Sequence, residues 1–195
     1  GIFAILTKPF YPVNIMHNIA KTSAAFLLIL LSASSIRTKA QTWSYMNGGM
    51  NSTVYALTTD TLSNKVYAGG DFTAAGGTPV NYIASWNGSA WSGVGSGTDG
   101  SVYAIVANND TVYAAGWFSN AGGAPASNIA MWDGTSWSAL GSGLDNYANA
   151  LIFYNNELYA CGPFSNAGGV PANHIAKWNG SSWSALGSGT NGTDL

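Results

Sequence analysis

Short hydrophobic and aromatic runs alternate with clusters of glycine and polar residues along most of the chain. Between residues 54 and 97, four such runs lie at 54–57, 65–68, 81–86 and 90–94. They are rich in β-branched or aromatic residues and are bounded by Gly, Asn, Asp and Ser, which is typical of strands. No window after Gln41 shows sustained helical periodicity. The pattern predicts an all-β chain with four antiparallel strands in this stretch.

The stretch of residues 54–97 is repeated twice more along the chain. Phe72, Phe118 and Phe164 are 46 residues apart. Two tryptophans of each copy keep the same spacing: Trp86, Trp132 and Trp178, and Trp91, Trp137 and Trp183. Residues 118–143 and 164–189 share 20 identities in 26 positions. A fixed period carried by aromatic positions indicates one supersecondary unit per copy.

Two kinds of connection are predicted inside each copy. The third and fourth runs are joined by dipeptides suited to a type I′ turn: Asn87-Gly88, Asp133-Gly134 and Asn179-Gly180. The second and third runs are joined by loops with a recurring Ala-Gly-Gly-x-Pro segment, at residues 71–80, 117–126 and 163–172. We attribute the segment to loop geometry, because glycine supplies positive φ and proline a fixed φ. We expect these loops to share one face with residues 95–101 and 141–147, which lead to the next copy.

Four antiparallel strands repeated at this spacing predict the blades of a β-propeller; a solenoid of stacked sheets is the alternative. The predicted fold is a partial β-propeller of about three four-stranded blades of 46–48 residues. A lone N-terminal outer strand precedes them, because residues 43–49 align with residues 91–97. A closed ring takes roughly four to eight blades, so we expect a fragment of a longer protein.

The residues of each copy also resemble known propeller families. A small pair ends the second run, as Gly69-Gly70, Ala115-Gly116 or Cys161-Gly162, and a Trp lies in the fourth, which resembles the kelch pattern. The motif F-[ST]-x-A-G-G-x-P-x-x-x-I-A-x-W-[ND]-G-x-x-W-S is similar to kelch-like repeats of large secreted Bacteroidota-type bacterial proteins. It is also similar to the repeats of the fungal cell-cortex polarity-marker family. The resemblance covers residues 41–195 and implies a fold more than a function, since propellers host many activities.

The beginning of the chain has the pattern of an export signal. Residues 16–40 contain a short basic region, an apolar core at 24–31 and a plausible cleavage site at 38–40, which predicts a signal peptide. The apolar core is shorter than the about 20 residues that span a membrane. Residues 1–15 precede the first credible start and are interpreted as an upstream or mis-called extension. We expect residues 41–195 to be secreted or exposed at the cell surface.

Charge and composition limit the classes of molecule that the chain is expected to bind. Four of the six basic residues lie before Gln41, which leaves Lys65 and Lys177 against eight acids and a net charge of −6. Such a surface disfavours nucleic acid and anionic lipid, so we expect neither as a partner. Three aspartates in polar turns, Asp60, Asp110 and Asp145, lack EF-hand spacing, so no metal or cofactor is predicted. Cys161 has no recurring His or acid beside it and is interpreted as a buried structural thiol.

Ligand choice is expected to come from loop positions that differ between copies. Asp71 and Trp117 share one column of the repeat, and Tyr82, Asn128 and His174 share another. Trp117 is suited to stacking on a sugar ring, with a local packing variant as the alternative. His174 is the only histidine after Gln41, and no catalytic set accompanies it. We therefore expect a non-catalytic scaffold that binds an extracellular glycan or protein. The alternative is an accessory propeller of a secreted enzyme whose catalytic domain lies beyond residue 195.

Overall fold

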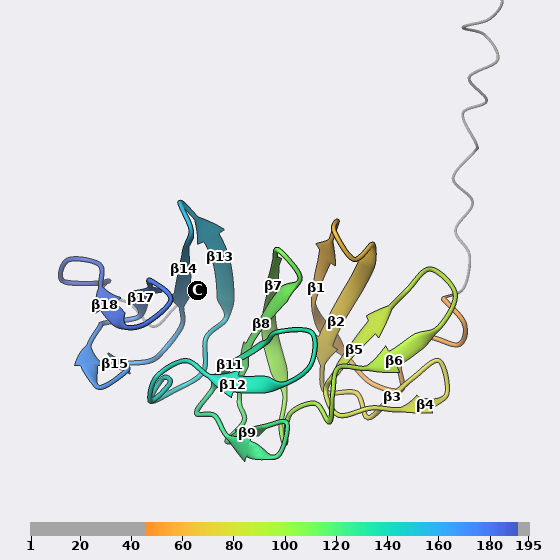
Figure 1. Cartoon of the computed structure of the whole chain (residues 1–195). Coiled ribbons are helices and arrows are strands. Elements are labelled where there is room, and N and C mark those ends of the chain that lie inside the picture. Colours follow the sequence, from red (N-terminus) through yellow and green to blue (C-terminus); the bar gives the residue numbers. More distant parts are fainter. Residues whose placement is uncertain (1–45, 191–195) are drawn as a thin grey trace, which may run out of the picture. The chain divides into compact units, whose positions relative to one another are not determined.

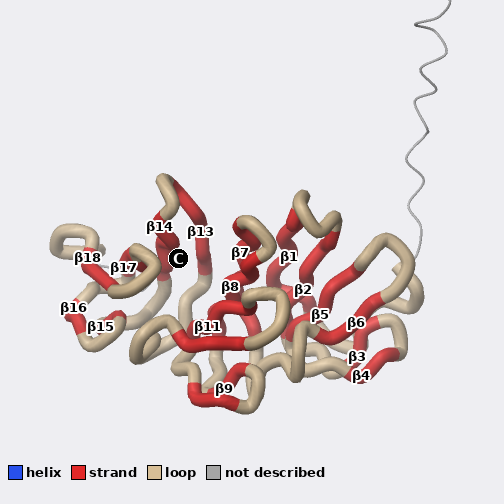
Figure 2. The backbone as a smooth tube through the Cα atoms, viewed as in Figure 1, coloured by secondary structure: helices blue, strands red, loops and turns tan. Residues whose placement is uncertain are grey.

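A computed structural model describes residues 46–190, which consist of strands, turns and loops without a helix (Figure 2). Three four-stranded antiparallel sheets follow one another along the chain, and we call them blades 1, 2 and 3 (Figure 1). In every blade the strands pair in chain order, with a small two-stranded hairpin between the second and third. The predicted all-β partial propeller with four strands per copy is confirmed.

The strands have the following bounds. Blade 1 contains β1 (Val54–Asp60), β2 (Lys65–Gly70), β5 (Ile83–Trp86) and β6 (Trp91–Gly93). Blade 2 contains β7 (Val102–Asn108), β8 (Thr111–Gly116), β11 (Ile129–Trp132) and β12 (Trp137–Ala139). Blade 3 contains β13 (Ala150–Tyr154), β14 (Glu157–Cys161), β17 (Ile175–Trp178) and β18 (Trp183–Ala185). The small hairpins pair β3 (Ala74–Ala75) with β4 (Thr78–Pro79), β9 (Asn120–Ala121) with β10 (Ala124–Pro125), and β15 (Asn166–Ala167) with β16 (Val170–Pro171).

The predicted type I′ turns at the Asn-Gly and Asp-Gly dipeptides are wrong. In blade 1, Trp86 pairs with Trp91, so the connection has four residues, and only Gly88 among them has positive φ. The Asn87 side chain folds this loop instead, because its Oδ1 accepts from the backbone N–H groups of Ser89 and Ala90, both at 2.9 Å. A local side-chain acceptor therefore replaces the two left-handed residues of a type I′ turn.

Two-residue connections with positive φ occur elsewhere in each blade. Asn109-Asp110 joins β7 to β8 and Asn155-Asn156 joins β13 to β14, with all four residues at positive φ. The small hairpin of blade 1 turns at Gly76-Gly77, with φ of 55° and 78°. The loops between second and third strands thus contain a hairpin that the sequence pattern did not predict, although the need for positive φ at their glycines is confirmed.

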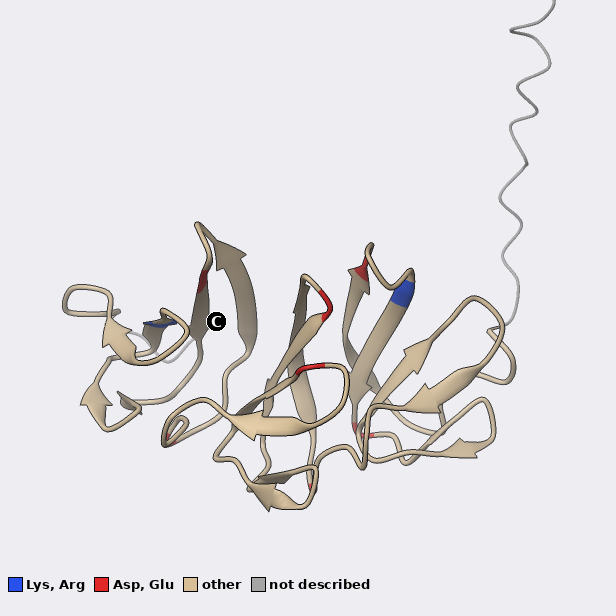
Figure 3. Cartoon of the chain, viewed as in Figure 1, with Lys and Arg blue, Asp and Glu red and all other residues tan. Residues whose placement is uncertain are grey.

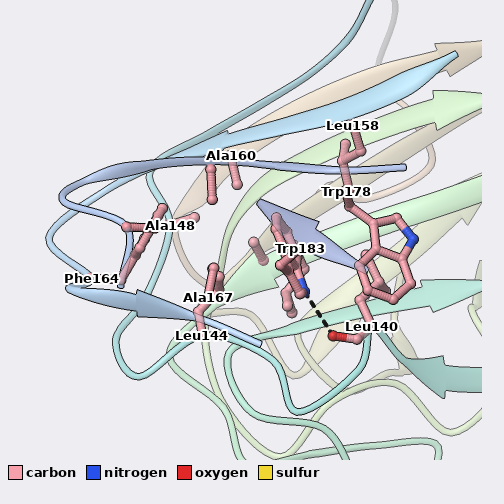
Figure 4. Packing of buried hydrophobic residues seen from close by; sticks show 13 residues of the cluster. Leu140, Leu144, Ala148, Leu158, Ala160, Phe164, Ala167, Trp178 and Trp183 are labelled. Carbon is pink, nitrogen blue, oxygen red and sulfur yellow. Dashed lines mark hydrogen bonds between the residues drawn. The ribbon is translucent and has the colours of Figure 1, made fainter. Parts of the chain in front are cut away.

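The buried core lies between neighbouring blades. β1 packs against β7, and β7 against β13, so the first strand of each blade faces the next. One cluster joins Tyr67 and Ile83 of blade 1 to Val102 and Ile105 of blade 2. A second joins blades 2 and 3 and includes Leu140 and Trp183 (Figure 4). Each blade therefore buries its apolar faces against its neighbours, as expected for a repeat protein.

One tryptophan of each copy links its blade to the strand end that precedes the blade. The indole Nε1–H groups of Trp137 and Trp183 donate to the backbone carbonyls of Val94 and Leu140, each at 2.8 Å. Figure 4 shows the second of these bonds inside the buried cluster. The other tryptophan packs on the same chain segment, because a Cβ added at Gly95 would lie 2.6 Å from the Trp132 ring. Glycine is needed there both for this close approach and for its positive φ of 56°.

The same link begins the described part of the chain. Trp91 Nε1 donates to the carbonyl oxygen of Met46 at 2.8 Å, so Met46 takes the place that Val94 and Leu140 take before the later blades. This agrees with the alignment that predicts a lone strand at residues 43–49. Residues 43–45 of that strand lie outside the described residues, and residues 46–49 form a turn. The predicted extension at 1–15 and signal peptide at 16–40 also lie outside them.

Replacing Trp137 with Phe tests the link between blades. Trp137→Phe keeps an aromatic ring but removes the indole bond to the Val94 carbonyl, which keeps only the backbone N–H of Gly97 at 3.0 Å as a donor. The loss of one hydrogen bond of this kind costs about 0.5–1.5 kcal/mol. The matched control is Trp132→Phe, whose indole donates to no carbonyl among residues 46–190. We expect Trp137→Phe to lower the free energy of unfolding more than the control by that amount, measured in urea by intrinsic fluorescence. Equal losses would show that only ring packing joins the blades.

Candidate functional site

The segments that lead into the three blades are fastened to the small hairpins. Their isolated bridges are Met50 with Ala75, Thr98 with Ala121, and Leu144 with Ala167. In blade 2, Asp99 Oδ1 accepts from the backbone N–H groups of Ser119 at 2.8 Å and Asn120 at 2.9 Å. Equivalent bonds are made by Asn51 in blade 1 and by Asp145 in blade 3. The two kinds of loop therefore lie side by side, at the end of the sheets where each first strand begins and each second strand ends.

At this end of the blades, four aromatic side chains form a row that we call the aromatic arc: Tyr55, Tyr103, Tyr147 and Trp117. Tyr55 and Tyr103 meet edge to face with ring centroids 5.3 Å apart, and Tyr103 meets Tyr147 at the same distance. Trp117 meets Tyr147 at 5.8 Å. These separations lie in the range favoured by aromatic pairs. Tyr55 and Trp117 stay 49% and 58% exposed, so the arc presents ring surface to solvent.

Residues of all three blades position the arc. Tyr55 lies near the start of β1 and Tyr103 near the start of β7. Trp117 directly follows β8, and its backbone N–H donates to the backbone carbonyl of Ser101 at 2.9 Å. Tyr147 lies in the segment before β13, where its N–H donates to the side chain of Asn146 at 2.9 Å. First strands face one another, and this arrangement brings together residues that are far apart in sequence.

A carboxylate adjoins the arc. Asp71 accepts from the Ser101 hydroxyl and from the Tyr55 hydroxyl, the latter at 2.5 Å. These donors, Ser101 first, lower the pKa of the Asp71 carboxyl. The bond to Asp71 in turn raises the pKa of the Tyr55 hydroxyl. Asp71 is therefore ionised at neutral pH and holds the Tyr55 ring in place.

Two clefts adjoin each other on this face. The first, which we call the tyrosine cleft, has a volume of about 440 Å³ and is lined by Tyr55, Tyr103, Tyr147 and Asn149. The second, the Trp117 cleft, has a volume of about 240 Å³ and is lined by Trp117, Phe118, Ser119, Ser127, Asn128 and Asp145. Because Trp117 and Tyr147 are in contact, the pair forms the boundary between the two clefts.

The structure brings together three of the five residues that the sequence suggested for binding. Asp71 and Trp117 lie at the arc, and Asn128 lies with Trp117 in the Trp117 cleft. Tyr82 lines a different cleft, of about 420 Å³, where blade 1 leads into blade 2. His174 is in blade 3, where its Nδ1 is 3.2 Å from the Gly162 carbonyl oxygen. These two residues do not join the arc.

The column of Tyr82, Asn128 and His174 also has a structural role. All three have positive φ, between 61° and 65°. The backbone N–H of each donates to the backbone carbonyl of the Phe that recurs every 46 residues. The backbone carbonyl of each accepts from the N–H of the glycine that ends or directly follows the second strand. This left-handed residue delays the start of the strand predicted at residues 81–86, so that β5 begins at Ile83 rather than at residue 81. Variation in this column is therefore limited by backbone conformation.

Sequence reasoning missed the three tyrosines of the arc. Tyr55 and Tyr103 occupy the same place in the Val-Tyr-Ala motif at the start of two first strands. That repetition was a usable signal, but alternation along a strand cannot say which face is covered by a neighbour. Tyr147 belongs to a different column, aligned with Ser101, so no repeat pattern pointed to it.

The acidic residues and the cysteine of the described residues do not gather in one place. Residues 46–190 contain no group of three His, Cys, Asp or Glu side chains placed to hold a metal ion. Asp145, one of the turn acids, serves instead as an acceptor for Ser165 and Asn166 of its hairpin. Cys161 is half-buried rather than fully buried as predicted, and burial raises the pKa of its thiol. A raised pKa disfavours the reactive thiolate.

The fold and this surface define a β-propeller domain with an exposed aromatic arc. The chain belongs to the family described as the Rax2 C-terminal beta propeller domain, whose model matches residues 28–195. The expected resemblance to the fungal polarity-marker family is thereby confirmed, and this is a family of the scaffold type. The resemblance to bacterial repeats stays a prediction. A search of curated proteins finds no match to the chain. Residues 46–190 form no helix of the length and apolarity that a membrane crossing requires.

Acid titration tests the role of Asp71. Because the folded-state pKa of Asp71 is lowered, its bonds stabilise the fold above the ordinary aspartate pKa of 3.8 and are lost as pH falls through the lowered value. We expect wild type to exceed Asp71→Asn in stability near neutral pH, and the difference to shrink toward about pH 2. Urea unfolding of both proteins across this pH range measures the difference. A difference that is constant with pH would contradict the assignment.

Substitution of His174 tests the left-handed column. His174→Val puts a β-branched residue at φ 65° and is expected to lower the free energy of unfolding by about 1–2 kcal/mol. His174→Asn is the control, because Asn128 adopts the same conformation in blade 2, and its effect is expected to stay within about 0.5 kcal/mol. Thermal unfolding of both variants compares them; equal stability would refute the conformational explanation.

Proposed function

We propose that this chain is an exported, non-catalytic propeller domain that binds glycan on the aromatic arc. The proposal has two parts, export and glycan binding. Export is supported by the signal-peptide pattern of residues 16–40. Binding is supported by the arc, in which Trp117 and Tyr55 expose ring faces beside the ionised carboxylate of Asp71.

The single observation that carries the binding proposal is the continuity of the arc. Four aromatic rings from three blades touch in sequence, from Tyr55 to Trp117. Exposed rings in a row cost solvation free energy unless a partner covers them. Sugar rings present C–H groups on their faces and hydroxyls at their edges, so they suit aromatic faces flanked by polar side chains. Asn149 in the tyrosine cleft and Asn128 beside Trp117 supply such polar groups.

Charge favours a glycan over nucleic acid or anionic lipid. Lys65 and Lys177 are the only Lys or Arg residues between residues 46 and 190. Figure 3 shows how few charged positions the blades carry. Lys177 is in addition paired with Glu157 at 2.9 Å. Binding to phosphate backbones relies on clustered Lys and Arg, which this surface lacks within the described residues.

Glycan binding by wild type and by Trp117→Ala tests the proposal. Soluble glycans are screened on an array, and hits are titrated by calorimetry. We expect Trp117→Ala to weaken binding by about 10–100-fold, which corresponds to the roughly 1–3 kcal/mol of one stacked ring. Its melting temperature should change little, since the ring is largely exposed.

The matched control is Tyr154→Ala. Tyr154 is 63% exposed, similar to Trp117, but it lies at the other end of β13 from the arc. This variant should bind as wild type does. Loss of binding in both variants would indicate nonspecific aromatic adhesion, and a blank array would contradict the glycan proposal.

A further inference from the structure

Resting on the proposed function, we infer that the ligand is an uncharged oligosaccharide that occupies the tyrosine cleft and the Trp117 cleft at the same time, with Trp117 between its sugar units. The inference concerns the length and the charge of the ligand. It follows from the arrangement of the two clefts, their sizes and the charges at their edges.

The two clefts share one boundary. Tyr147 lines the tyrosine cleft and Trp117 lines the other, and their ring centroids are 5.8 Å apart. The chain segment from Asp145 to Asn149 runs along both, because Asp145 lines the Trp117 cleft and Asn149 the tyrosine cleft. A ligand leaving one cleft along this segment therefore meets the exposed face of Trp117 and then the second cleft.

The sizes of the clefts favour an extended ligand. Sites for small molecules usually measure about 300–1,000 Å³. The tyrosine cleft, at about 440 Å³, lies at the lower end of that range, and the Trp117 cleft, at about 240 Å³, lies below it. The smaller cleft alone gives a ligand little burial, whereas a chain of sugars that fills both gains from two linked contacts at once.

A carboxylate lies at the edge of each cleft, and no Lys or Arg of residues 46–190 lines either one. Asp71 bonds to Tyr55 at the tyrosine cleft and is ionised because its donors lower its pKa. Asp145 lines the Trp117 cleft; partial burial opposes ionisation, but bonds from Asn166 and Ser165 prevail and lower its pKa. Neither Lys65 nor Lys177 lines either cleft. A uronic acid or sulfated sugar would therefore meet uncompensated negative charge.

The remaining polar groups suit hydroxyls. Asn149 in the tyrosine cleft and Ser119, Ser127 and Asn128 in the Trp117 cleft are neutral donors and acceptors. The amide of Asn128 is held in position, since its Nδ2 donates to the Leu144 carbonyl at 2.9 Å. The hydroxyls of a neutral sugar can therefore form hydrogen bonds in both clefts, and no charged group on the ligand is needed.

A length series of neutral oligosaccharides tests the inference with the full chain. Disaccharides to hexasaccharides of a neutral polysaccharide found on the array are titrated, beside uronic acid oligomers of matched length. We expect affinity to rise by about tenfold or more beyond the disaccharide and then level off, and the uronic acid series to bind at least about tenfold more weakly.

Two variants test whether each cleft contributes to the higher affinity for longer oligosaccharides. Asn149→Ala in the tyrosine cleft and Ser119→Ala in the Trp117 cleft should each weaken the hexasaccharide several-fold, whereas the disaccharide should respond to only one of them. Tyr154→Ala serves again as control and should change neither affinity.

The outcomes separate this inference from the proposed function. Equal affinity for disaccharide and hexasaccharide, with loss of both in Trp117→Ala, would overturn the two-cleft inference and leave glycan binding intact. Preferential binding of uronic acid oligomers would overturn the inference on charge. Absence of binding to every oligosaccharide would refute the proposed function and the inference together.

Discussion

The structure depends on burial between blades that cannot shelter their own faces. The buried clusters join one blade to the next, and at each junction an indole Nε1–H donates to a backbone carbonyl of the preceding blade. The apolar contact is non-directional, so it brings the sheets together but does not orient them. The indole bond, which repeats at 2.8 Å for Trp91, Trp137 and Trp183, gives each junction one orientation.

The fixed junctions between blades also build the candidate binding face. Because the first strands of successive blades face each other, side chains near their starts come within contact distance. The small hairpins are held against the connecting segments by Asn51, Asp99 and Asp145, which keeps the rims of the clefts in place. A rigid rim favours the binding of an uncharged ligand, because a preorganised site loses less conformational entropy on binding. The scaffold and the candidate site are thus consequences of the same repeat.

The backbone conformation limits which residues can occupy the positions that differ between copies. The column of Tyr82, Asn128 and His174 varies in side chain but keeps positive φ in all three copies. The column of Asp71 and Trp117 varies freely at the exposed end of the second strand, and there the two side chains serve the arc in different ways, one as an acceptor and one as a ring. The positions that repeat in every copy therefore build the scaffold, and the positions that differ between copies shape the candidate site.

The sequence by itself determined the four main strands of each blade, the blade period and the all-β class, because strand periodicity and the placement of glycines are local properties that recur in every copy. It also indicated Asp71, Trp117 and Asn128 as variable positions at loops. Only the tertiary structure decided that Tyr55, Tyr103 and Tyr147 join Trp117 in one arc, and that Tyr82 and His174 lie elsewhere. The physical reason is that these features depend on how one blade packs on the next, and packing between distant segments leaves no periodic trace along the chain.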